Sequence, residues 1–157
     1  FLKGKIADGF IRKVRGNSYS EDLVNGDAVA VIGWSGDMFI LKSENNGKFD
    51  FAIPESGGML WSDNMLIPST STHKKNAEAL INYYYEPAVA AEVAAYVNYI
   101  CPVEEAKSEL EKIDPALAES PFIFPDEATL AKVKVFRALS ADEQTKFQAA
   151  FDEAIGN

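Results

Sequence analysis

Two tryptophan–aspartate pairs are the residues whose types and spacing could do chemistry. Trp61 and Asp63 lie two positions apart in the run Gly57–Pro68, so in an extended backbone both side chains point to one face. Trp34 and Asp37 form a second pair. An indole offers a flat, electron-rich apolar face, and a carboxylate accepts charge-assisted hydrogen bonds. Together they suit a ligand that is apolar along its length and cationic at its ends.

Each pair also has a structural interpretation. Gly57–Pro68 is equally typical of a buried strand that carries a core tryptophan and a solvated aspartate. Asp37 could complement the dipole at the start of a helix. Trp34 is less typical of a core residue, because a bulky ring between Gly33 and Gly36 at the end of a strand tends to face a cleft. The presence of Trp34 and Asp37 as a second pair therefore favours the ligand-wall interpretation of Gly57–Pro68 over the buried strand.

The expected elements place Trp34 and Asp37 just beyond the carboxyl end of a strand. Ala28–Gly33 is a short apolar run typical of a strand buried on both faces of a parallel sheet. A helix through Met38 and Leu41 should follow it, and a second strand is predicted over Phe49–Ile53. Open α/β sheets bind ligands outside the carboxyl ends of their strands. The sequence therefore predicts an α/β protein with a cleft at this edge.

Most of the remaining chain is predicted to be helical. Residues 1–17 are expected to be linker and irregular strand, and 114–125 a proline-rich connector. The sequence Ser140-Ala-Asp-Glu143 is a capping box, which predicts where the last helix begins. The predicted helices are a short one ending at Gly26, then 73–85, Pro87 to about Asn98, 103–113, 126–139, and Ser140 to Gly156.

Composition excludes several classes of protein. The chain has 157 residues, no apolar run near the roughly 18 residues of a membrane span, and a net charge of −9 that argues against nucleic-acid binding. Cys101 is the only cysteine, so an internal disulfide and a cysteine zinc site are excluded. His73 has no second ligand at a metal-binding spacing, and we expect neither a metal nor a cofactor. Because the chain starts with Phe1, we expect a piece of a longer protein.

The sequence predicts a binding protein rather than an enzyme. It contains no Gly-x-Ser-x-Gly nucleophile turn, no Gly-x-Gly-x-x-Gly loop and no phosphate-loop lysine. A carboxylate-based hydrolase that uses Asp37 and Asp63 as a glycosidase-like pair stays open as an alternative, because sugars also stack on tryptophan. Nothing in the sequence singles out a partner for proton transfer.

Four segments carry a resemblance to a known family. Taken in this order, they resemble the C-terminal half of the spermidine/putrescine-binding proteins of bacterial ABC importers, over the chain from about Tyr19 to its end. The segments are Gly33-Trp34-Ser35-Gly36-Asp37, Gly58-Met59-Leu60-Trp61-Ser62-Asp63-Asn64, Asn82-Tyr83-Tyr84 and Tyr96-Val97-Asn98-Tyr99-Ile100-Cys101-Pro102.

The resemblance implies a fold and a division into lobes. The fold is α/β, a three-layer α/β/α lobe of a type II periplasmic-binding protein, and the chain is the C-terminal part of a two-lobed clamp. Residues 1–57 and 107–157 would form the second lobe, while 58–106 would be the hinge crossing and part of the first lobe. Gly57 and Gly58 are then hinge candidates. The clamp's N-terminal half would be missing.

The resemblance also implies roles for five residues. Trp34 and Trp61 would stack on the methylenes of a polyamine, Asp37 and Asp63 would accept its ammonium groups, and Tyr99 would form a wall or donate a hydrogen bond. Some members carry a glutamine near Phe136-Arg137, where this chain has an arginine that would repel a polyamine. No ligand role is assigned there.

The implied partners are a polyamine ligand, the membrane permease of an ABC importer and the missing N-terminal half. The implied location is extracytoplasmic: the periplasm or, in Gram-positive bacteria, a cell-surface lipoprotein. A related clamp for a sugar, an amino acid or a metal chelate is the alternative within the binding class. Without the first lobe, apolar surface should be exposed around Leu80, Ile81 and Val93.

Overall fold

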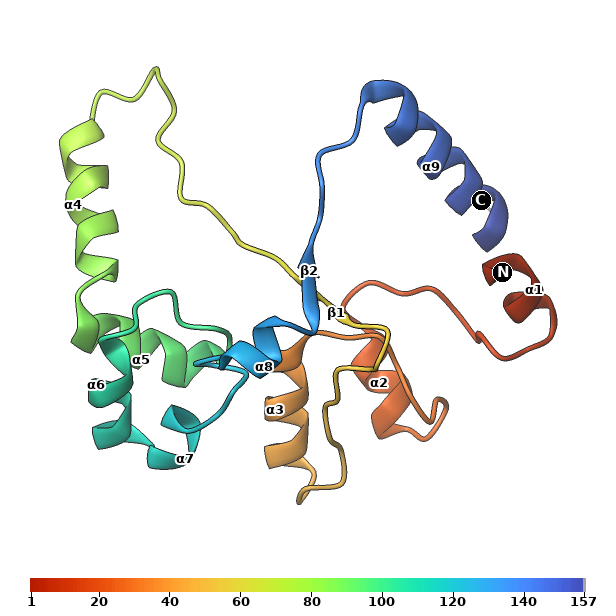
Figure 1. Ribbon diagram of the computed structural model, residues 1–157, viewed down its shortest axis with the longest axis horizontal. Helices are drawn as coiled ribbons and strands as arrows, with labels where there is room; N and C mark the ends of the chain where they lie inside the picture. The colour runs from red at the N-terminus through yellow and green to blue at the C-terminus, as the bar shows by residue number, and fades with distance from the viewer. Residues whose placement is uncertain (157) are drawn as a thin grey trace. The chain divides into compact units, whose positions relative to one another are not determined.

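The computed structural model describes residues 1–156 (Figure 1). They divide into two compact units, Phe1–Gly33 with the segment that starts at Phe136, and Trp34–Val135. In chain order the elements are α1 (Leu2–Ala7), α2 (Tyr19–Val24), α3 (Ser35–Glu44), β1 (Gly58–Leu60), α4 (Lys74–Tyr84), α5 (Pro87–Val97), α6 (Ala106–Ile113), α7 (Pro115–Ala118), α8 (Glu127–Leu130), β2 (Val133–Val135) and α9 (Ala141–Ile155).

The helices with strong start signals form as predicted. Pro87 opens α5 at the first helical position, where its missing N–H would have no partner anyway. The capping box opens α9, with Ser140 Oγ accepting from the Glu143 N–H at 3.3 Å and the Glu143 carboxylate accepting from the Ser140 N–H at 2.9 Å. Gly156 ends α9 in a left-handed conformation, as predicted.

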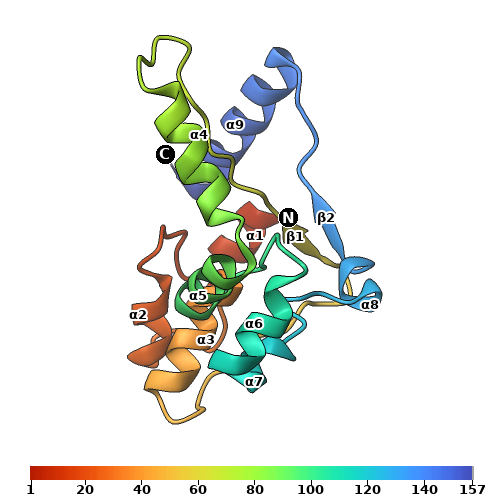
Figure 2. The same ribbon diagram turned by 90° about the vertical axis from the view of Figure 1, so that its left-hand side faces the viewer.

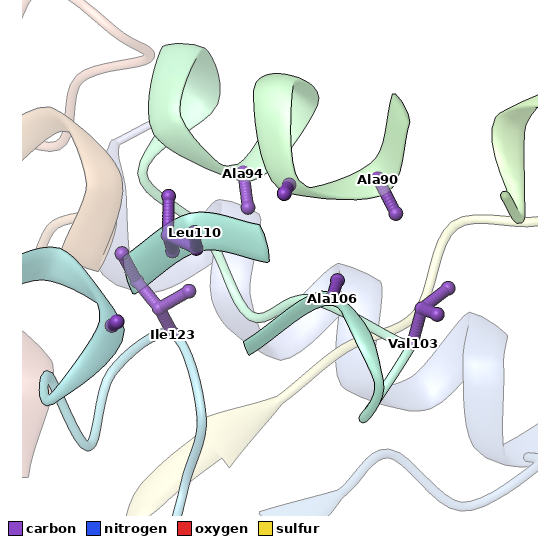
Figure 3. Packing of buried hydrophobic residues seen from close by; sticks show 8 residues of the cluster. Ala90, Ala94, Val103, Ala106, Leu110 and Ile123 are labelled. Atoms are coloured by element: carbon purple, nitrogen blue, oxygen red, sulfur yellow. The ribbon is translucent and has the colours of Figure 1, made fainter. Parts of the chain in front are cut away.

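The core of the second unit lies between α5, α6 and α7, which pack side by side in both views (Figures 1 and 2). Leu110 on α6 and Ile123 after α7 are the largest fully buried side chains in the described chain. They point toward the alanine-rich face of α5, where Ala90 and Ala94 allow close approach (Figure 3). This core holds the chain just after α5 in place.

A two-stranded parallel pair joins β1 to β2 in the second unit. Gly58, Met59 and Leu60 pair with Val133, Lys134 and Val135 in register. Gly57 precedes the pair with φ +98°, and a Cβ at this position would lie 2.9 Å from the Lys132 carbonyl oxygen. A glycine is therefore needed where the two strands meet. The parallel pairing agrees with the predicted α/β class, and the three-layer lobe stays a prediction.

Gly57→Ala should destabilise the second unit by about 1–3 kcal/mol, because it combines the left-handed backbone with a clash against the Lys132 carbonyl. Gly26→Ala is the matched control, since its φ is also positive (+77°) but open space surrounds it. Urea unfolding of the full-length protein measures both. An equal loss of stability in the two variants would mean that the clash contributes nothing.

Two predicted strands do not form among residues 1–156. Ala28–Gly33 and Phe49–Ile53 have no strand partner, and Val29 and Ile32 are fully exposed. A buried parallel strand requires a neighbour on each edge to satisfy its N–H and C=O groups. The apolar runs are present, but the described residues supply no neighbouring strand for them. The predicted wall strand over 57–68 is likewise shorter and ends at Leu60.

Three other predictions were wrong in part. The helix expected over 126–139 is the single turn of α8 followed by β2, because Val133 and Val135 alternate with lysines at strand spacing. Residues 1–17, expected to be irregular, begin with α1. The connector 114–125 contains the short helix α7, which the Asp114 side chain caps by accepting from the Ala116 and Leu117 N–H groups.

The first unit is held together by ion pairs around α2 and α9. Asp22, 7% exposed, accepts from Arg12 Nη1 and from Arg15 Nε, each at 2.7 Å. These bonds tie the segment before α2 to the helix. Lys3 on α1 pairs with Glu153 on α9 at 2.7 Å, and the two helices pack together (Figure 1).

Glu143 should titrate unusually low. The Arg137 guanidinium (Nη2 to Oε1, 2.7 Å) and the Ser140 N–H lower the pKa of Glu143 from 4.5 to about 2. Since the folded pKa is depressed, this stabilisation of α9 is complete above about pH 4.5 and is lost as the pH falls through about 2. Carboxyl-carbon NMR should show a midpoint near 2 that rises in Arg137→Ala. Lys3→Ala, which frees Glu153 instead, should leave it unchanged.

The predicted apolar surface around Leu80, Ile81 and Val93 is exposed at one of the three residues. Leu80 on α4 is 68% exposed, while Ile81 and Val93 are partly buried. The predicted lobe boundaries (1–57 with 107–157, and 58–106) concern the whole clamp and stay a prediction.

Within residues 1–156, no helix is both long and apolar enough to cross a membrane.

Candidate functional site

Four of the five predicted site residues lie together in the second unit. The rings of Trp34 and Trp61 are in edge contact at 5.6 Å between centroids, and Trp61 contacts Tyr99 in the same way at 5.6 Å. The Tyr99 hydroxyl donates to Asp37 Oδ1 at 3.2 Å. These four residues are called the Trp61 array below, because Trp61 contacts the ring on either side of it.

The start of α3 positions the first two members. Trp34 is the N-cap residue with an extended backbone, and Asp37 lies in the first turn, as predicted. The helix is anchored by Met38 and Leu41, which are 5% and 8% exposed. One fixed helix start therefore presents an indole and a carboxylate.

The end of β1 positions Trp61. Leu60 is the last residue paired with β2, opposite Val135, and Trp61 follows directly. Gly57 and Gly58 lead into the strand pair, and the Gly58 N–H donates to the Lys132 carbonyl at 2.9 Å. The strand pair thus fixes the backbone immediately before the indole.

The end of α5 positions Tyr99. Asn98 adopts a left-handed conformation (φ 58°), and its N–H donates to the Ala94 carbonyl at 2.9 Å. Two residues beyond Tyr99, the Cys101 N–H donates to the Ile123 carbonyl at 2.9 Å, next to the core. Tyr99 is therefore held between a helix cap and a core anchor.

The indoles of the Trp61 array remain accessible. Trp34 is 44% exposed and Trp61 is 40% exposed, although both are in ring contact. Edge contacts leave part of each ring to meet an apolar chain or a cation. The residues fit a binding wall better than a closed core.

The electrostatics of the array favour a cation. Burial, together with the charge of Asp37 and its hydrogen bond, raises the pKa of Tyr99 to about 12. The phenol therefore stays protonated at neutral pH and donates to the carboxylate. The array presents aromatic rings beside one carboxylate and no basic side chain.

Asp63 lies outside the array. It is exposed, and within residues 1–156 its carboxylate makes no hydrogen bond or ion pair. The neighbouring Asn64 amide donates to the Ser62 carbonyl at 3.3 Å, which organises only this local segment. The predicted role of Asp63 as an ammonium acceptor stays a prediction, as do the roles of the other four residues.

The sequence analysis missed the close packing of Tyr99 against Gly36. A Cβ at this position would lie 2.5 Å from Tyr99 Cε2 and 2.7 Å from Cζ, so the ring occupies the space of the absent side chain. The available signal was a glycine in the first turn of a helix, where propensity disfavours it. The contact with Tyr99, 63 positions along the chain, had no sequence signature.

Arg137, to which no ligand role was assigned, has an acidic partner of its own. The Arg137 guanidinium binds the Glu143 carboxylate in the first unit. Among the residues that the structure describes, no group of three or more histidine, cysteine, aspartate or glutamate side chains is placed to hold a metal ion.

Comparison with known proteins identifies the family. A family model described as bacterial extracellular solute-binding protein matches residues 3–121. The chain is 28% identical to a putrescine/agmatine-binding protein of Pseudomonas aeruginosa over 127 residues, covering 78% of this chain and 34% of that protein. It is 29% identical to the putrescine-binding periplasmic protein PotF of Escherichia coli, with the same coverage.

A third relative is the spermidine/putrescine-binding periplasmic protein of Salmonella typhimurium, which is 32% identical over 116 residues, or 74% of this chain and 31% of that protein. The chain spans about a third of the length of the curated relatives it matches. The family match covers most of the chain and includes the whole Trp61 array. The chain therefore belongs to the family of bacterial extracellular solute-binding proteins.

Proposed function

We propose that the chain is part of the solute-binding component of a polyamine ABC importer and that it binds spermidine or putrescine without breaking a bond. The observation that carries the proposal is the Trp61 array, which joins two accessible indoles, a phenol and a carboxylate in one contact series. The names of three relatives, each a polyamine-binding protein, support the same ligand class.

The chemistry of a polyamine matches the array in two respects. Its methylenes are apolar and flexible, and they would lie against the rings of Trp34 and Trp61. Its ammonium groups would donate to the Asp37 carboxylate and, in the whole protein, to Asp63. Cation–π contact adds about 0.5–2 kcal/mol for each desolvated ring, and charge-assisted hydrogen bonds fix the ends of the ligand.

The whole protein would work as a two-lobed clamp outside the cytoplasm. Because the chain spans about a third of its relatives, we propose that residues beyond it supply the other lobe and further ligand contacts. The exposed Leu80 on α4 and the lone Asp63 would face that lobe. Closure on the ligand would present the protein to a membrane permease.

A clamp for another solute is the alternative within the family. Sugars also stack on tryptophan, but the Trp61 array offers one carboxylate and one phenol hydroxyl already bonded to each other. A sugar site needs several neutral donors and acceptors around the ring. A hydrolase that uses Asp37 and Asp63 is less well supported, because only Asp37 belongs to the array and the relatives are named as binding proteins.

Calorimetry of the full-length protein tests the proposal. Putrescine and spermidine should each release binding heat that weakens from low to high salt, because screening reduces the ammonium–carboxylate attraction. Maltose, a neutral solute, should give none. Heat with maltose alone, or hydrolysis of chromogenic glycosides that Asp63→Asn abolishes, would contradict it.

A further inference from the structure

We propose that Gly36 and Tyr99 act together as positioning residues that hold the Asp37 carboxylate in its ligand-binding orientation. The inference rests on the proposed polyamine site and adds the means by which its carboxylate is oriented. The observation is a series of contacts among three residues. The Tyr99 ring occupies the space where a side chain at Gly36 would lie, and the Tyr99 hydroxyl donates a hydrogen bond to Asp37.

Gly36 is a poor choice for its local structure. It lies inside α3, where glycine is less favourable than alanine by up to about 1 kcal/mol. It is buried, and a Cβ there would meet three atoms of the Tyr99 ring at 2.5, 2.7 and 2.8 Å. Ordinary contacts of a Cβ fall between 3.4 and 4 Å. The absence of a side chain at position 36 therefore makes room for the Tyr99 ring.

Tyr99 has little freedom to move away from an added methyl group. Trp61 contacts its ring at 5.6 Å between centroids, and its backbone is held by the Asn98 cap and the Cys101 anchor. A methyl group at position 36 must displace the ring. The hydroxyl bond to Asp37, at 3.2 Å, is already longer than a typical O–H···O hydrogen bond and would break.

Tyr99 also remains a donor across the physiological pH range. The burial of the phenol and the nearby Asp37 charge both raise its pKa, so the proton stays on the hydroxyl. The phenol therefore holds the Asp37 carboxylate as a neutral hydrogen-bond donor. A phenylalanine at position 99 would keep the ring packing and remove only this bond.

Double-mutant calorimetry with spermidine on the full-length protein tests the coupling. Tyr99→Phe should raise Kd about tenfold, the usual effect of losing a hydrogen bond to a charged group, and Gly36→Ala should do the same. In an Asp37→Ala background, each should change Kd less than twofold, because both act through that carboxylate.

Two matched variants serve as controls. Tyr84→Phe alters another partly buried tyrosine, whose pKa is raised by burial rather than by a carboxylate, and Gly4→Ala fills open space in α1. Both should leave Kd within twofold. A full tenfold loss from Tyr99→Phe or Gly36→Ala in the Asp37→Ala background overturns the inference, and so does no loss in the wild-type background.

A ligand-free measurement separates this inference from the proposed function. Ring-carbon NMR should show the pKa of Tyr99 near 12 in the wild type and shifted toward its usual value of 10 in both Gly36→Ala and Asp37→Ala. If no polyamine binds but these shifts occur, the proposed ligand is wrong and the positioning stands. If the pKa of Tyr99 is the same in all three proteins, the positioning is wrong whatever the ligand.

Discussion

Trp61→Ala is expected to weaken spermidine binding by the full-length protein at least 30-fold, or about 2 kcal/mol, because it removes the central ring of the array. The indole contacts both Trp34 and Tyr99, so its loss also frees the two neighbouring rings. Calorimetry measures the change in Kd directly.

Two further variants serve as controls for the Trp61→Ala result. Trp61→Phe keeps a smaller ring and should cost less than the alanine variant. Phe147→Ala removes an exposed ring on α9, outside the array and in the other unit, and should leave Kd unchanged. Equal losses in Trp61→Ala and Phe147→Ala would indicate a general effect on folding and would contradict the assigned role.

Leu110→Ala is expected to lower the free energy of unfolding by about 2–5 kcal/mol. Leu110 is fully buried between α5 and the segment that holds Ile123, so a truncated side chain leaves a cavity that its neighbours cannot fill. The same core anchors Cys101, two residues beyond Tyr99. Urea unfolding of the full-length protein measures the loss.

Leu130→Ala is the control for the core prediction. It makes the same chemical change on α8, where the side chain is 43% exposed, and should cost less than half as much. If Leu110→Ala were as mild as Leu130→Ala, the α5–α6–α7 core could not be what holds Tyr99 in place.

The sequence predicted best where local chemistry decides the outcome. Pro87 fixed the start of α5, and the Ser140–Glu143 capping box fixed the start of α9. Trp34, Asp37 and Trp61 were predicted from their residue types and spacing, whereas Tyr99 was predicted only from the resemblance to the family. Their assembly in one unit follows from α3, β1 and the end of α5.

Long-range pairing decided the features that the sequence did not predict. Ala28–Gly33 has the composition of a buried strand, but a strand forms only against partners that its own residues do not specify. β2 lies within the stretch predicted as the helix 126–139, and it forms by pairing with β1, which is distant in the sequence. Gly36 shows the same limit, because its role depends on a ring 63 positions away.

A crystal structure of the full-length protein with spermidine would show the proposed site directly. The methylenes should lie against the Trp34 and Trp61 rings, and an ammonium nitrogen should lie within hydrogen-bond distance of the Asp37 carboxylate, with the Tyr99 hydroxyl still bonded to Oδ1. A ligand bound elsewhere on the protein, or one whose ammonium groups avoid Asp37, would contradict it.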